Sequence, residues 1–484
     1  MIYPHTYMFL LQISYYFKQI VKIWVSGYTL CMKGYADYFE GKKITVLGLG
    51  LLGKRIECIK FFSDCGAQVL VTDLKTKKEL AEALAQLKNY KNITYHLGGH
   101  DLADFEDCDF VLKGQGTPLD SVYIAHAQKK GIPVEMDESL FLKLAPKDVT
   151  VIGVTGTRGK TTTTMLIYHT LKKYTTSPQP TPRQEREKHR VFLGGNIKGT
   201  AVLPLLKTIK SGDTLVLELS SWQLQGFGDA KISPTISVFT NFMEDHLNYY
   251  KGSMDAYFLD KSHIVSYQKK GDVCVAGDSV YTKIKKLKPR GTLVKAEVNN
   301  IPKNWHLLIP GEHNRENAAC AYEALRAYGL KGVDIKKGFE SFKGVEGRLS
   351  FVRNYKGISI YNDTCSTTPS ALSVALQSFP DKHIVLISGG TTKHIPLGNL
   401  PKLISKYAGE VVMLPGTGTN ELTSVLQQGT YTNSKTLKDA VKQALTRATK
   451  GSIVLFSPGF TSFGMFKNEY DRGDQFEKII KELK

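Results

Sequence analysis

Residues 153–164, with the sequence GVTGTRGKTTTT, follow a β-branched run typical of a buried strand and precede a stretch with helical periodicity. In a glycine-rich loop between a strand and a helix, the backbone N–H groups can wrap around a polyphosphate. Lys160 is placed to neutralise the β and γ phosphates, and the Thr161 hydroxyl can ligate Mg²⁺. Val154 stands where the strict pattern has its first glycine, so the loop is a variant. The stretch predicts an ATP or GTP site.

A second glycine-rich turn lies upstream, at Gly48-Leu-Gly50-Leu-Leu-Gly53, directly after an expected strand over residues 44–47. Asp73 ends the next expected strand, 20 residues beyond Gly53. Glycines let the backbone turn tightly and approach a phosphate, whose charge then lies at a helix N-terminus. The turn therefore predicts a nucleotide site and leaves the nucleotide open. The alternative is a tight strand-to-helix turn without a ligand.

Short β-branched runs alternate with helical stretches from residue 43 onward, and the alternation resumes after Gly347. This pattern predicts an α/β protein with parallel sheets covered by helices. A segment rich in proline and charge, residues 175–190, is expected to be a surface loop. The predicted organisation is an N-terminal extension at 1–39, followed by domains at 40–147, 148–345 and 346–484.

The composition of the 484 residues, 42% hydrophobic and 23% charged, excludes disordered and collagen-like classes. The net charge of +19 favours anionic partners, including phosphates, nucleotides, nucleic acid or an acidic membrane surface. Seven scattered cysteines without a C-x-x-C pair argue against a disulfide framework or zinc site and indicate a reducing cytosol. One basic cluster is interpreted as a solvated face rather than a nucleic-acid site: Lys283, Lys285, Lys286, Lys288 and Arg290.

The first 31 residues leave three interpretations open. Apolar residues between positions 13 and 24 have helical spacing opposite Lys18 and Lys22, which is typical of an amphipathic helix at a membrane surface. The segment could instead precede the true start at Met32, or pack as an extension of the first domain. It is too short and too polar to predict a transmembrane span, and it lacks a secretory cleavage pattern.

Further stretches, in the same order along the chain, resemble the Mur ligases, the ATP-dependent amide-forming enzymes of peptidoglycan synthesis. They include GGNI (194–197), LELSSWQL (217–224), TNFMEDHLNYY (240–250), YFLDKSHI (257–264), GEHNRENAACA (311–321), GRLS (347–350), NDTCSTTP (362–369), ISGGTTK (387–393) and SPGFTSFGMFKNEYDRG (457–473). The resemblance covers about residue 38 to the C-terminus. It implies a Rossmann-like N-terminal domain, a central P-loop ATPase-type domain and a C-terminal Rossmann-like domain.

Within the family, the chain most resembles the branch that adds D-glutamate to UDP-N-acetylmuramoyl-L-alanine through an acyl phosphate. The resemblance implies ATP, two Mg²⁺ ions and a CO₂-derived carbamate on Lys261 as the groups involved. A cytoplasmic monomer that binds no nucleic acid is expected. The implied catalytic residues are Lys160, Glu218, His246 and Lys261, and the implied metal ligands are Thr161, Glu218, His246 and Lys261.

The resemblance also implies three groups of binding residues. Those for ATP are Gly156, Thr157, Gly159, Lys160, Thr161, Thr162, Asn314, Asn317, Arg348 and Asp363, with Asn314 and Asn317 on the adenine side. Those for the UDP-linked substrate are Gly48, Gly50, Leu51, Gly53, Asp73, Asn196 and His246. Those for the amino acid are Thr367, Lys393, Ser462 and Phe463.

Four departures from the family pattern leave the acceptor amino acid open. Cys365 stands where many D-glutamate-adding enzymes have lysine, which removes a cation from the amino-acid pocket. The others are Leu52, Lys198 and Gly114-Gln-Gly116. L-Glutamate or another amino acid is therefore an alternative acceptor. Two other classes, a nicotinamide-dependent oxidoreductase and a silent scaffold, leave the P-loop and the implied metal ligands unexplained.

Overall fold

The computed structural model describes residues 34–50, 53–176, 190–197, 199 and 201–483. Most of the predicted N-terminal extension, together with Leu51, Leu52, Lys198 and the centre of the predicted surface loop, lies outside these residues. The described chain divides into two compact units. The first unit contains the described residues up to 148, Gly199, and residues 201–211 and 225–230. The second unit contains the remaining described residues.

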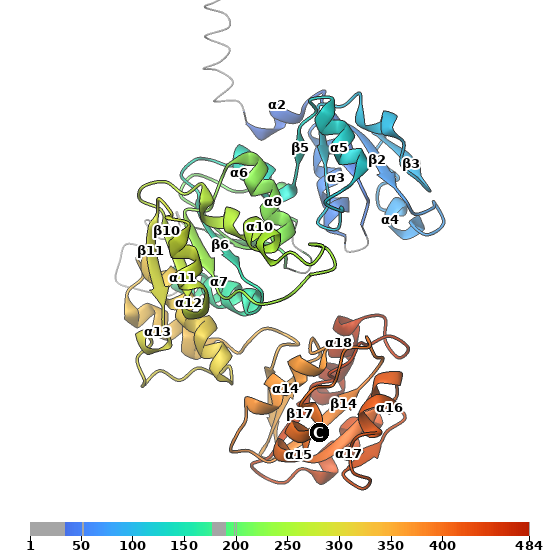
Figure 1. Cartoon of the computed structure of the whole chain (residues 1–484), viewed down its shortest axis with the longest axis vertical. Coiled ribbons are helices and arrows are strands. Elements are labelled where there is room, and N and C mark those ends of the chain that lie inside the picture. The colour runs from blue at the N-terminus through green and yellow to red at the C-terminus, as the bar shows by residue number, and fades with distance from the viewer. Residues whose placement is uncertain (1–33, 51–52, 177–189, 198, 200, 484) are drawn as a thin grey trace, which may run out of the picture. The chain divides into compact units, whose positions relative to one another are not determined.

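The first unit is built on a five-stranded sheet with the order β3-β2-β1-β4-β5 (Figure 1). All four neighbouring pairs are parallel. The central strands are apolar because both faces of a parallel sheet are covered. The strands are β1 (Lys43–Leu47), β2 (Gln68–Asp73), β3 (Ile93–Leu97), β4 (Phe110–Leu112) and β5 (Val134–Glu135).

Helices connect these strands in the manner of βαβ units. The α-helices are α2 (Tyr35–Phe39), α3 (Lys54–Asp64), α4 (Ala81–Ala85), α5 (Val122–Lys129) and α6 (Asp137–Leu144). Two 3₁₀ helices belong to the same unit, η1 (Leu102–Phe105) and η2 (Leu203–Lys207). The later segment η2 contacts both α3 and α6, so part of the chain beyond residue 148 packs in the first unit.

The second unit contains two sheets. The sheet that follows directly in sequence has six parallel strands in the order β11-β10-β9-β6-β8-β7. The strands are β6 (Thr150–Thr155), β7 (Val191–Gly195), β8 (Thr214–Glu218), β9 (Ile236–Phe239), β10 (Val273–Gly277) and β11 (Thr292–Ala296). The helices around it are α7 (Lys160–Thr176), α10 (Met254–Ser266), α11 (Asp278–Lys286), η3 (Val298–Asn300), α12 (Glu312–Ala327) and α13 (Gly332–Ser341). Helix α9 (Ser221–Ala230) begins in this unit, and its residues 225–230 belong to the first unit.

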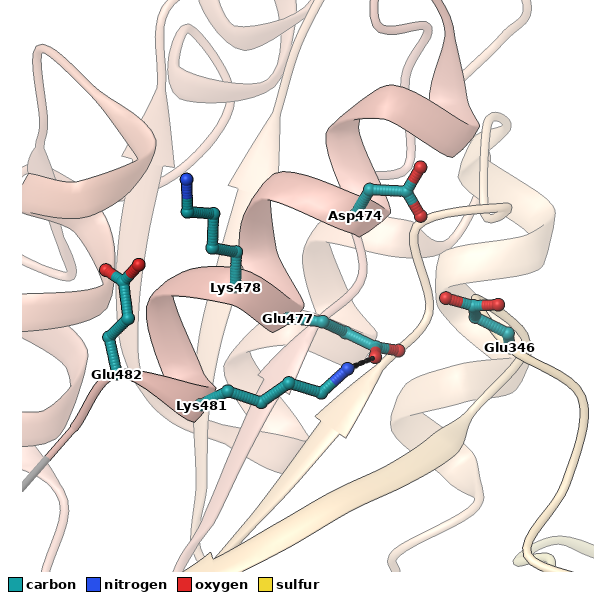
Figure 2. Close-up of a pocket in the computed structure, with 6 residues that line it drawn as sticks. All are labelled: Glu346, Asp474, Glu477, Lys478, Lys481 and Glu482. Atoms are coloured by element: carbon teal, nitrogen blue, oxygen red, sulfur yellow. Dashed lines mark hydrogen bonds and ion pairs between the residues drawn. The ribbon is translucent and has the colours of Figure 1, made fainter.

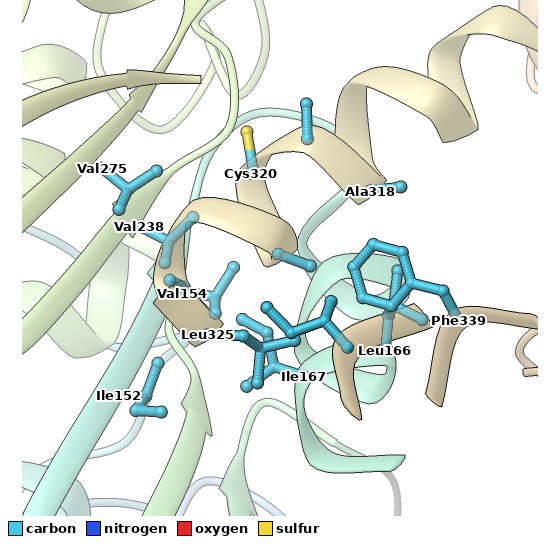
Figure 3. Close-up of a cluster of buried hydrophobic side chains, with 14 of the residues drawn as sticks. Ile152, Val154, Leu166, Ile167, Val238, Val275, Ala318, Cys320, Leu325 and Phe339 are labelled. Atoms are coloured by element: carbon cyan, nitrogen blue, oxygen red, sulfur yellow. The ribbon is translucent and has the colours of Figure 1, made fainter. Parts of the chain in front are cut away.

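An apolar core lies between this sheet and helices α7, α12 and α13 (Figure 3). Ile152 and Val154 of β6 alternate with side chains on the other face, as the period-2 strand pattern requires. Leu166 of α7 and Leu325 of α12 are fully buried against them. Phe339 of α13 completes the cluster on the helical side. This packing holds the start of α7, and with it the glycine-rich loop, against the sheet.

The remaining sheet has the order β12-β13-β17-β14-β15-β16. β12 and β13 form an antiparallel pair, whereas the other neighbours are parallel. The strands are β12 (Ser350–Tyr355), β13 (Ile358–Asn362), β14 (Ile384–Gly389), β15 (Ala408–Leu414), β16 (Tyr431–Asn433) and β17 (Ile453–Phe456). The helices are α14 (Pro369–Gln377), α15 (Leu400–Tyr407), α16 (Thr417–Thr423), α17 (Leu437–Arg447) and α18 (Glu469–Lys481).

The predicted α/β class with three parallel-sheet regions is confirmed. Each of the three predicted domains contains one of the sheets, while the exact boundaries stay predictions. The predicted surface loop begins too early, because Thr175 and Thr176 continue helix α7 and bond to its preceding carbonyls. Within the described residues, no helix combines the length and apolar character that a membrane span requires.

Gly338→Ala is expected to destabilise the central region although alanine favours helices. A Cβ atom at Gly338 of α13 would collide with the Thr170 side chain of α7. Overpacking costs about 1–3 kcal/mol, which exceeds the gain of about 1 kcal/mol in helix propensity. Urea unfolding followed by tryptophan fluorescence would measure the loss, because Trp305 lies in this core.

Gly332→Ala is the matched control in the same helix. A Cβ atom there would meet no other atom within 4 Å, so this variant should be as stable as the wild type or slightly more stable. Equal stability of the two variants would contradict the packing described for α7 and α13.

Candidate functional site

The glycine-rich loop joins the carboxyl end of β6 to the first turn of α7. Gly156 has φ of 147° and Gly159 has φ of 79°. A Cβ atom on Gly156 would collide with Thr240, and one on Gly159 would collide with Asn317. Glycine is required at both positions by backbone conformation and by close packing.

Residues that follow β9 fix the shape of this loop. The Thr157 N–H donates to the Asn241 carbonyl at 2.9 Å, and the Arg158 N–H donates to the Asn241 side-chain oxygen at 2.8 Å. The Thr240 hydroxyl donates to the Arg158 carbonyl at 2.6 Å. The loop is therefore held in one conformation by hydrogen bonds to protein groups, as a preorganised phosphate site requires.

Two lysine ammonium groups converge on one oxygen of the loop. The Gly156 carbonyl accepts from Lys160 Nζ at 3.1 Å and from Lys261 Nζ at 2.9 Å. Lys261 of α10 is 1% exposed and forms no ion pair within the described residues. Burial, together with the nearby charge of Lys160, holds the pKa of Lys261 well below its ordinary value. An anion bound at this loop would interact with the Lys160 charge and would also favour the charged form of Lys261.

Glu218 ends β8, the strand beside β6. Its carboxylate is 2% exposed, and Oε1 accepts a hydrogen bond from Asn196 Nδ2 at 3.0 Å. Oε2 is buried without a hydrogen-bond partner among the described residues. A carboxylate oxygen left without a donor is costly unless a cation or donor completes it. Hard oxygen ligands of this kind suit Mg²⁺, so the residues present fit the predicted metal.

His246 lies in the loop after β9 with a left-handed backbone, φ of 53°. Its ring is tilted against Trp222 with centroids 4.7 Å apart and lies edge-on to Tyr257. Burial is the main cause that lowers the pKa of His246, and the Lys261 and Lys160 charges add to it, while Asp245 opposes them. The imidazole is consequently neutral near pH 7, which is the form that ligates metals.

Asn314 and Asn317 lie on the first turns of α12 and are buried. Asn317 Nδ2 donates to Asn314 Oδ1 at 3.2 Å, and Asn314 Nδ2 donates to the Pro310 carbonyl at 2.7 Å. Both amides thus bond within the protein, beneath Gly159. Their predicted contact with the adenine side of ATP stays a prediction, and the structure gives them a supporting position under the loop.

The turn in the first unit connects β1 to α3. Gly48, Gly50 and Gly53 have φ of 82°, 71° and 79°, so each adopts the left-handed conformation that glycine favours. Asp73, at the end of β2, accepts the Leu49 N–H at 2.7 Å and the Lys75 N–H at 2.9 Å. Asp73 therefore shapes the turn, and its predicted contact with the UDP-linked substrate stays a prediction.

The predicted amino-acid residues lie where parallel strands of the last sheet end. Thr367 follows β13, Lys393 follows β14, and Ser462 and Phe463 follow β17. These three strands are direct neighbours in the order β13-β17-β14. Lys393 Nζ donates to the Thr367 hydroxyl at 3.3 Å. Thr391 bridges to Thr461 and donates to the Phe463 carbonyl at 2.6 Å, which brings the loop after β17 beside the loop after β14.

Asp363 and Arg348 differ in exposure. Asp363 Oδ1 accepts the Leu349 N–H at 3.0 Å and Oδ2 accepts the Ser457 hydroxyl at 2.7 Å. Burial raises the pKa of Asp363 to about 7 despite these hydrogen bonds. The Arg348 side chain is exposed. Arg348 is thus available to a ligand, whereas the carboxylate of Asp363 is already bonded to protein groups.

A hollow beside α18 contains none of the predicted site residues (Figure 2). It is lined by Glu346, Asp474, Glu477, Lys478, Lys481 and Glu482. Lys481 pairs with Glu477 at 2.8 Å across one turn of the helix. Exposed pairs of this kind contribute little energy, and the lining indicates no ligand.

Several residues of the site were not singled out from the sequence. Asn241 and Asp245 lie within the quoted stretch at 240–250, and Trp222 lies within the stretch at 217–224. Asp245 pairs with Arg158 at 3.0 Å. Arg472 is 1% exposed and donates to the carbonyls of Thr364 and Phe460. All four residues lie inside stretches that resemble the family, and this is the signal that could have found them. Their hydrogen-bond and ion-pair partners are distant in sequence, so the sequence does not indicate these contacts.

Two family models match the chain. The Mur ligase middle domain matches residues 154–295, and the Mur ligase MurD-like, N-terminal domain matches residues 42–135. Among curated relatives, the UDP-N-acetylmuramoylalanine–D-glutamate ligase of Borreliella afzelii is 33% identical, covering 92% of this chain and 98% of that protein. The protein of that name from a Roseiflexus species is 33% identical, covering 91% and 98%.

Solved structures share the fold at lower identity. The UDP-N-acetylmuramate–alanine ligase of Thermotoga maritima aligns with a TM-score of 0.54 at 21% identity, covering 92% of this chain and 100% of that one. The UDP-N-acetylmuramoylalanyl-D-glutamyl-2,6-diaminopimelate–D-alanyl-D-alanyl ligase of Acinetobacter baumannii aligns with a TM-score of 0.55 at 15% identity, covering 86% and 90%.

The three sheets and the glycine-rich loop define an α/β protein of the P-loop nucleotide-binding type. The family models and the relatives that match nearly the whole chain make the assignment specific. The chain belongs to the Mur ligase family.

Asp363→Asn is expected to change how stability depends on pH. Because the pKa of the folded carboxyl is about 7 against an ordinary value of 3.8, the folded protein binds this proton more tightly than the unfolded chain. The resulting stabilisation is full below pH 3.8, declines from there to pH 7, and is lost above pH 7. The free energy of unfolding of the variant, relative to that of wild type, should therefore rise by up to about 4 kcal/mol as the pH increases from 3.8 to 7.

Urea unfolding followed by circular dichroism at several pH values would measure this difference. Asp474→Asn, at an exposed position of α18, is the matched control and should show no such trend. A stability difference between Asp363→Asn and wild type that stays constant from pH 4 to 8 would contradict the raised pKa.

Proposed function

We propose that this protein is an ATP-dependent ligase that joins D-glutamate to UDP-N-acetylmuramoyl-L-alanine in peptidoglycan precursor synthesis. The observation that carries the proposal is the convergence of Lys160, Lys261 and Glu218 around the loop after β6. The relatives that share 33% identity over nearly the whole chain carry this name and support the same assignment. A cytoplasmic location and a monomeric state are part of the proposal. All six described cysteines are free thiols, which is consistent with a reducing compartment.

ATP is proposed to lie with its phosphates on the N–H groups of residues 159–162, at the start of α7, because the N–H groups of Thr157 and Arg158 already bond to Asn241. Lys160 Nζ already points to this loop and can move from the Gly156 carbonyl to a phosphate oxygen. The exposed Arg348 would neutralise further phosphate charge. The substrate carboxylate attacks the γ-phosphorus and ADP leaves. Both reactants are anions, so charge neutralisation and alignment are the main contributions of the protein.

Thr161, Glu218 and His246 are the residues that would hold two Mg²⁺ ions. Glu218 supplies its unpaired Oε2, and Asn196 holds the other oxygen of that carboxylate in place. Burial is the main cause that lowers the pKa of His246, which favours the neutral imidazole, and one of its two ring nitrogens then has a free lone pair. The ions, when bound, neutralise phosphate and carboxylate charge during the transfer.

Glutamate is proposed to bind where β13, β17 and β14 end. Lys393, Thr367 and Ser462 would bind its carboxylates, and Phe463, 64% exposed, would cover it. The amine nitrogen then attacks the acyl carbon and loses a proton to water, and phosphate leaves. Cys365 carries no positive charge in either protonation state, and burial raises the pKa of its thiol, so it adds no cation at the position where the family resemblance leads us to expect lysine. An acceptor pocket with fewer cations leaves acidic amino acids other than D-glutamate as the second candidate.

Phosphate release is the measurement that tests the function. With UDP-N-acetylmuramoyl-L-alanine, ATP and Mg²⁺, we expect release with D-glutamate to exceed release with L-glutamate and other amino acids. Lys160→Ala and His246→Ala should each abolish it, because they remove phosphate neutralisation and a metal ligand. Lys283→Ala is a matched lysine control, since its Nζ lies over the rings of Phe242 and Phe258 instead.

Release with another amino acid but not with D-glutamate would remove the specific acceptor and keep the ligase. No release with any amino acid would contradict the proposed function altogether. Turnover retained by Lys160→Ala or His246→Ala would contradict the roles given to these residues.

Lys261 is proposed to carry a carbamate. Because its pKa is well below the ordinary value, the side chain is available as a neutral amine. The amine nitrogen attacks the carbon of CO₂, one C=O electron pair moves to oxygen, and a proton is released to water. The product replaces a buried amine, bonded only to the Gly156 carbonyl, by an anion that suits the nearby cations.

The carbamate should appear as a bound ¹³C resonance after incubation of the protein with ¹³C-bicarbonate. Lys261→Gln should lack the signal, whereas Lys295→Gln, at an exposed ion-paired position, should keep it. A signal that persists in Lys261→Gln would assign the modification to another lysine. The complete absence of a signal in wild type would contradict the modification.

A further inference from the structure

Three segments that precede the strands β9, β10 and β11 carry exposed cations that the ligase reaction does not use, and the last segment begins in the final turn of α11. Their side chains are all exposed to solvent. We call this set the basic edge: Lys231, Lys269, Lys270, Lys285, Lys286, Lys288 and Arg290. Because the three strands are parallel neighbours, their amino ends lie at the same edge of the sheet (Figure 1).

Hydrogen bonds between the three loops hold the basic edge together. The buried Gln268 amide donates to the Pro234 carbonyl at 3.1 Å and to the Val273 carbonyl at 2.9 Å. The Thr292 N–H donates to the Asp272 carbonyl at 2.8 Å. A Cβ atom on Gly291 would lie only 2.8 Å from Gln268 Oε1, so the last loop packs directly on its neighbour. The cations are therefore presented by a fixed scaffold.

The charge of the basic edge is uncompensated. None of its seven side chains forms an ion pair with another residue of the described ranges. Asp272 is the single acidic residue in these loops, and its carboxylate accepts the Lys269 N–H at 2.7 Å. Lys283, one turn earlier on α11, is different because its Nζ lies over two phenylalanine rings. The basic edge is thus a surface with free positive charge.

The side chains of the basic edge suit a lipid surface better than a nucleic acid. Leu287 lies between Lys286 and Lys288 and is 40% exposed, so an apolar group accompanies the charges. Tyr267, the aromatic residue of these loops, is partly buried near His263 and offers no exposed face for stacking bases. Six of the seven cations are lysines, which act as point charges rather than as bidentate readers of phosphate.

We propose that the basic edge binds the anionic surface of a phospholipid bilayer and holds the protein there peripherally. β6 is parallel to β9 and runs into the glycine-rich loop at its carboxyl end. That loop therefore lies at the edge of the sheet opposite the basic edge. Docking through the basic edge leaves the glycine-rich loop open to its ligands. This inference does not depend on the identity of the amino acid that the ligase adds.

Cosedimentation of the full chain with vesicles tests the proposal. Vesicles of phosphatidylcholine with about 40 mol% phosphatidylglycerol should bind the protein, vesicles of phosphatidylcholine alone should not, and salt should weaken the binding. Each cation close to such a surface contributes a factor of about five. We expect the quadruple variant Lys285→Gln, Lys286→Gln, Lys288→Gln and Arg290→Gln to bind about 600-fold more weakly.

A charge-matched control carries Lys402→Gln, Lys435→Gln, Lys438→Gln and Lys442→Gln, all at exposed positions around the last sheet. It should bind vesicles like wild type. Both variants should keep wild-type phosphate release and circular dichroism melting, which separates loss of binding from loss of fold or of ligase activity.

Three outcomes would overturn the proposal. The quadruple variant could bind vesicles as tightly as wild type, which would place the interaction elsewhere in the chain. The charge-matched control could lose as much affinity for vesicles as the quadruple variant, which would show that binding depends on the net charge and not on the basic edge. Wild type could bind duplex or single-stranded nucleic acid more tightly than vesicles at equal salt, with the quadruple variant losing that binding. This last result would identify the surface as a nucleic-acid site.

Discussion

The Gly156 carbonyl oxygen accepts hydrogen bonds from two lysines, Lys160 at 3.1 Å and Lys261 at 2.9 Å. Because both nitrogens are bonded to one oxygen, they are at most about 6 Å apart, where two full positive charges repel by about 3 kcal/mol at an effective dielectric constant of 20. The protein relieves this repulsion by lowering the pKa of the buried Lys261. Placing an anion on the loop would relieve it further. Burial also lowers the pKa of Lys160, and the negative charge of Glu218 opposes this fall.

Much of the fold could be predicted because its signals are local. The run at 153–164 specifies a strand, a loop and a helix within 12 residues, and the structure has β6, the loop and α7 there. The hydrogen bonds from Lys160 and Lys261 to the Gly156 carbonyl could not be predicted in this way. Lys261 is 105 positions away, and it reaches the loop only because α10 packs beside β6 and β9. Periodicity and turn signals cannot determine such a contact, so Lys261 was identified through a family resemblance.

Side-chain partners were the least predictable part of the site. Asn314 and Asn317 were assigned to the adenine side of ATP, yet their amides bond to each other and to the backbone beneath Gly159. Asp363 likewise uses both carboxylate oxygens within the protein. A polar residue in a functional motif can support a loop or bind a ligand, and the two roles use the same side-chain types. Only the three-dimensional arrangement shows which hydrogen bonds are already made.

The polarity of the parallel sheets explains why binding groups gather as they do. In the last sheet the neighbours β13, β17 and β14 are not consecutive in sequence, so Thr367, Ser462 and Lys393 meet only through the strand order. In the central sheet the same polarity separates two kinds of positive charge. Lys160 and Lys261 follow the carboxyl ends of strands, and Lys261 is buried there, which makes its charge costly and demands a specific anion. The cations of the basic edge precede the amino ends, where water solvates them and a diffuse anionic surface suffices to attract them. The net charge of +19 therefore includes two kinds of cation at opposite edges of the central sheet. Those at the carboxyl ends of the strands need a specific anion, whereas those before the amino ends are stabilised by water.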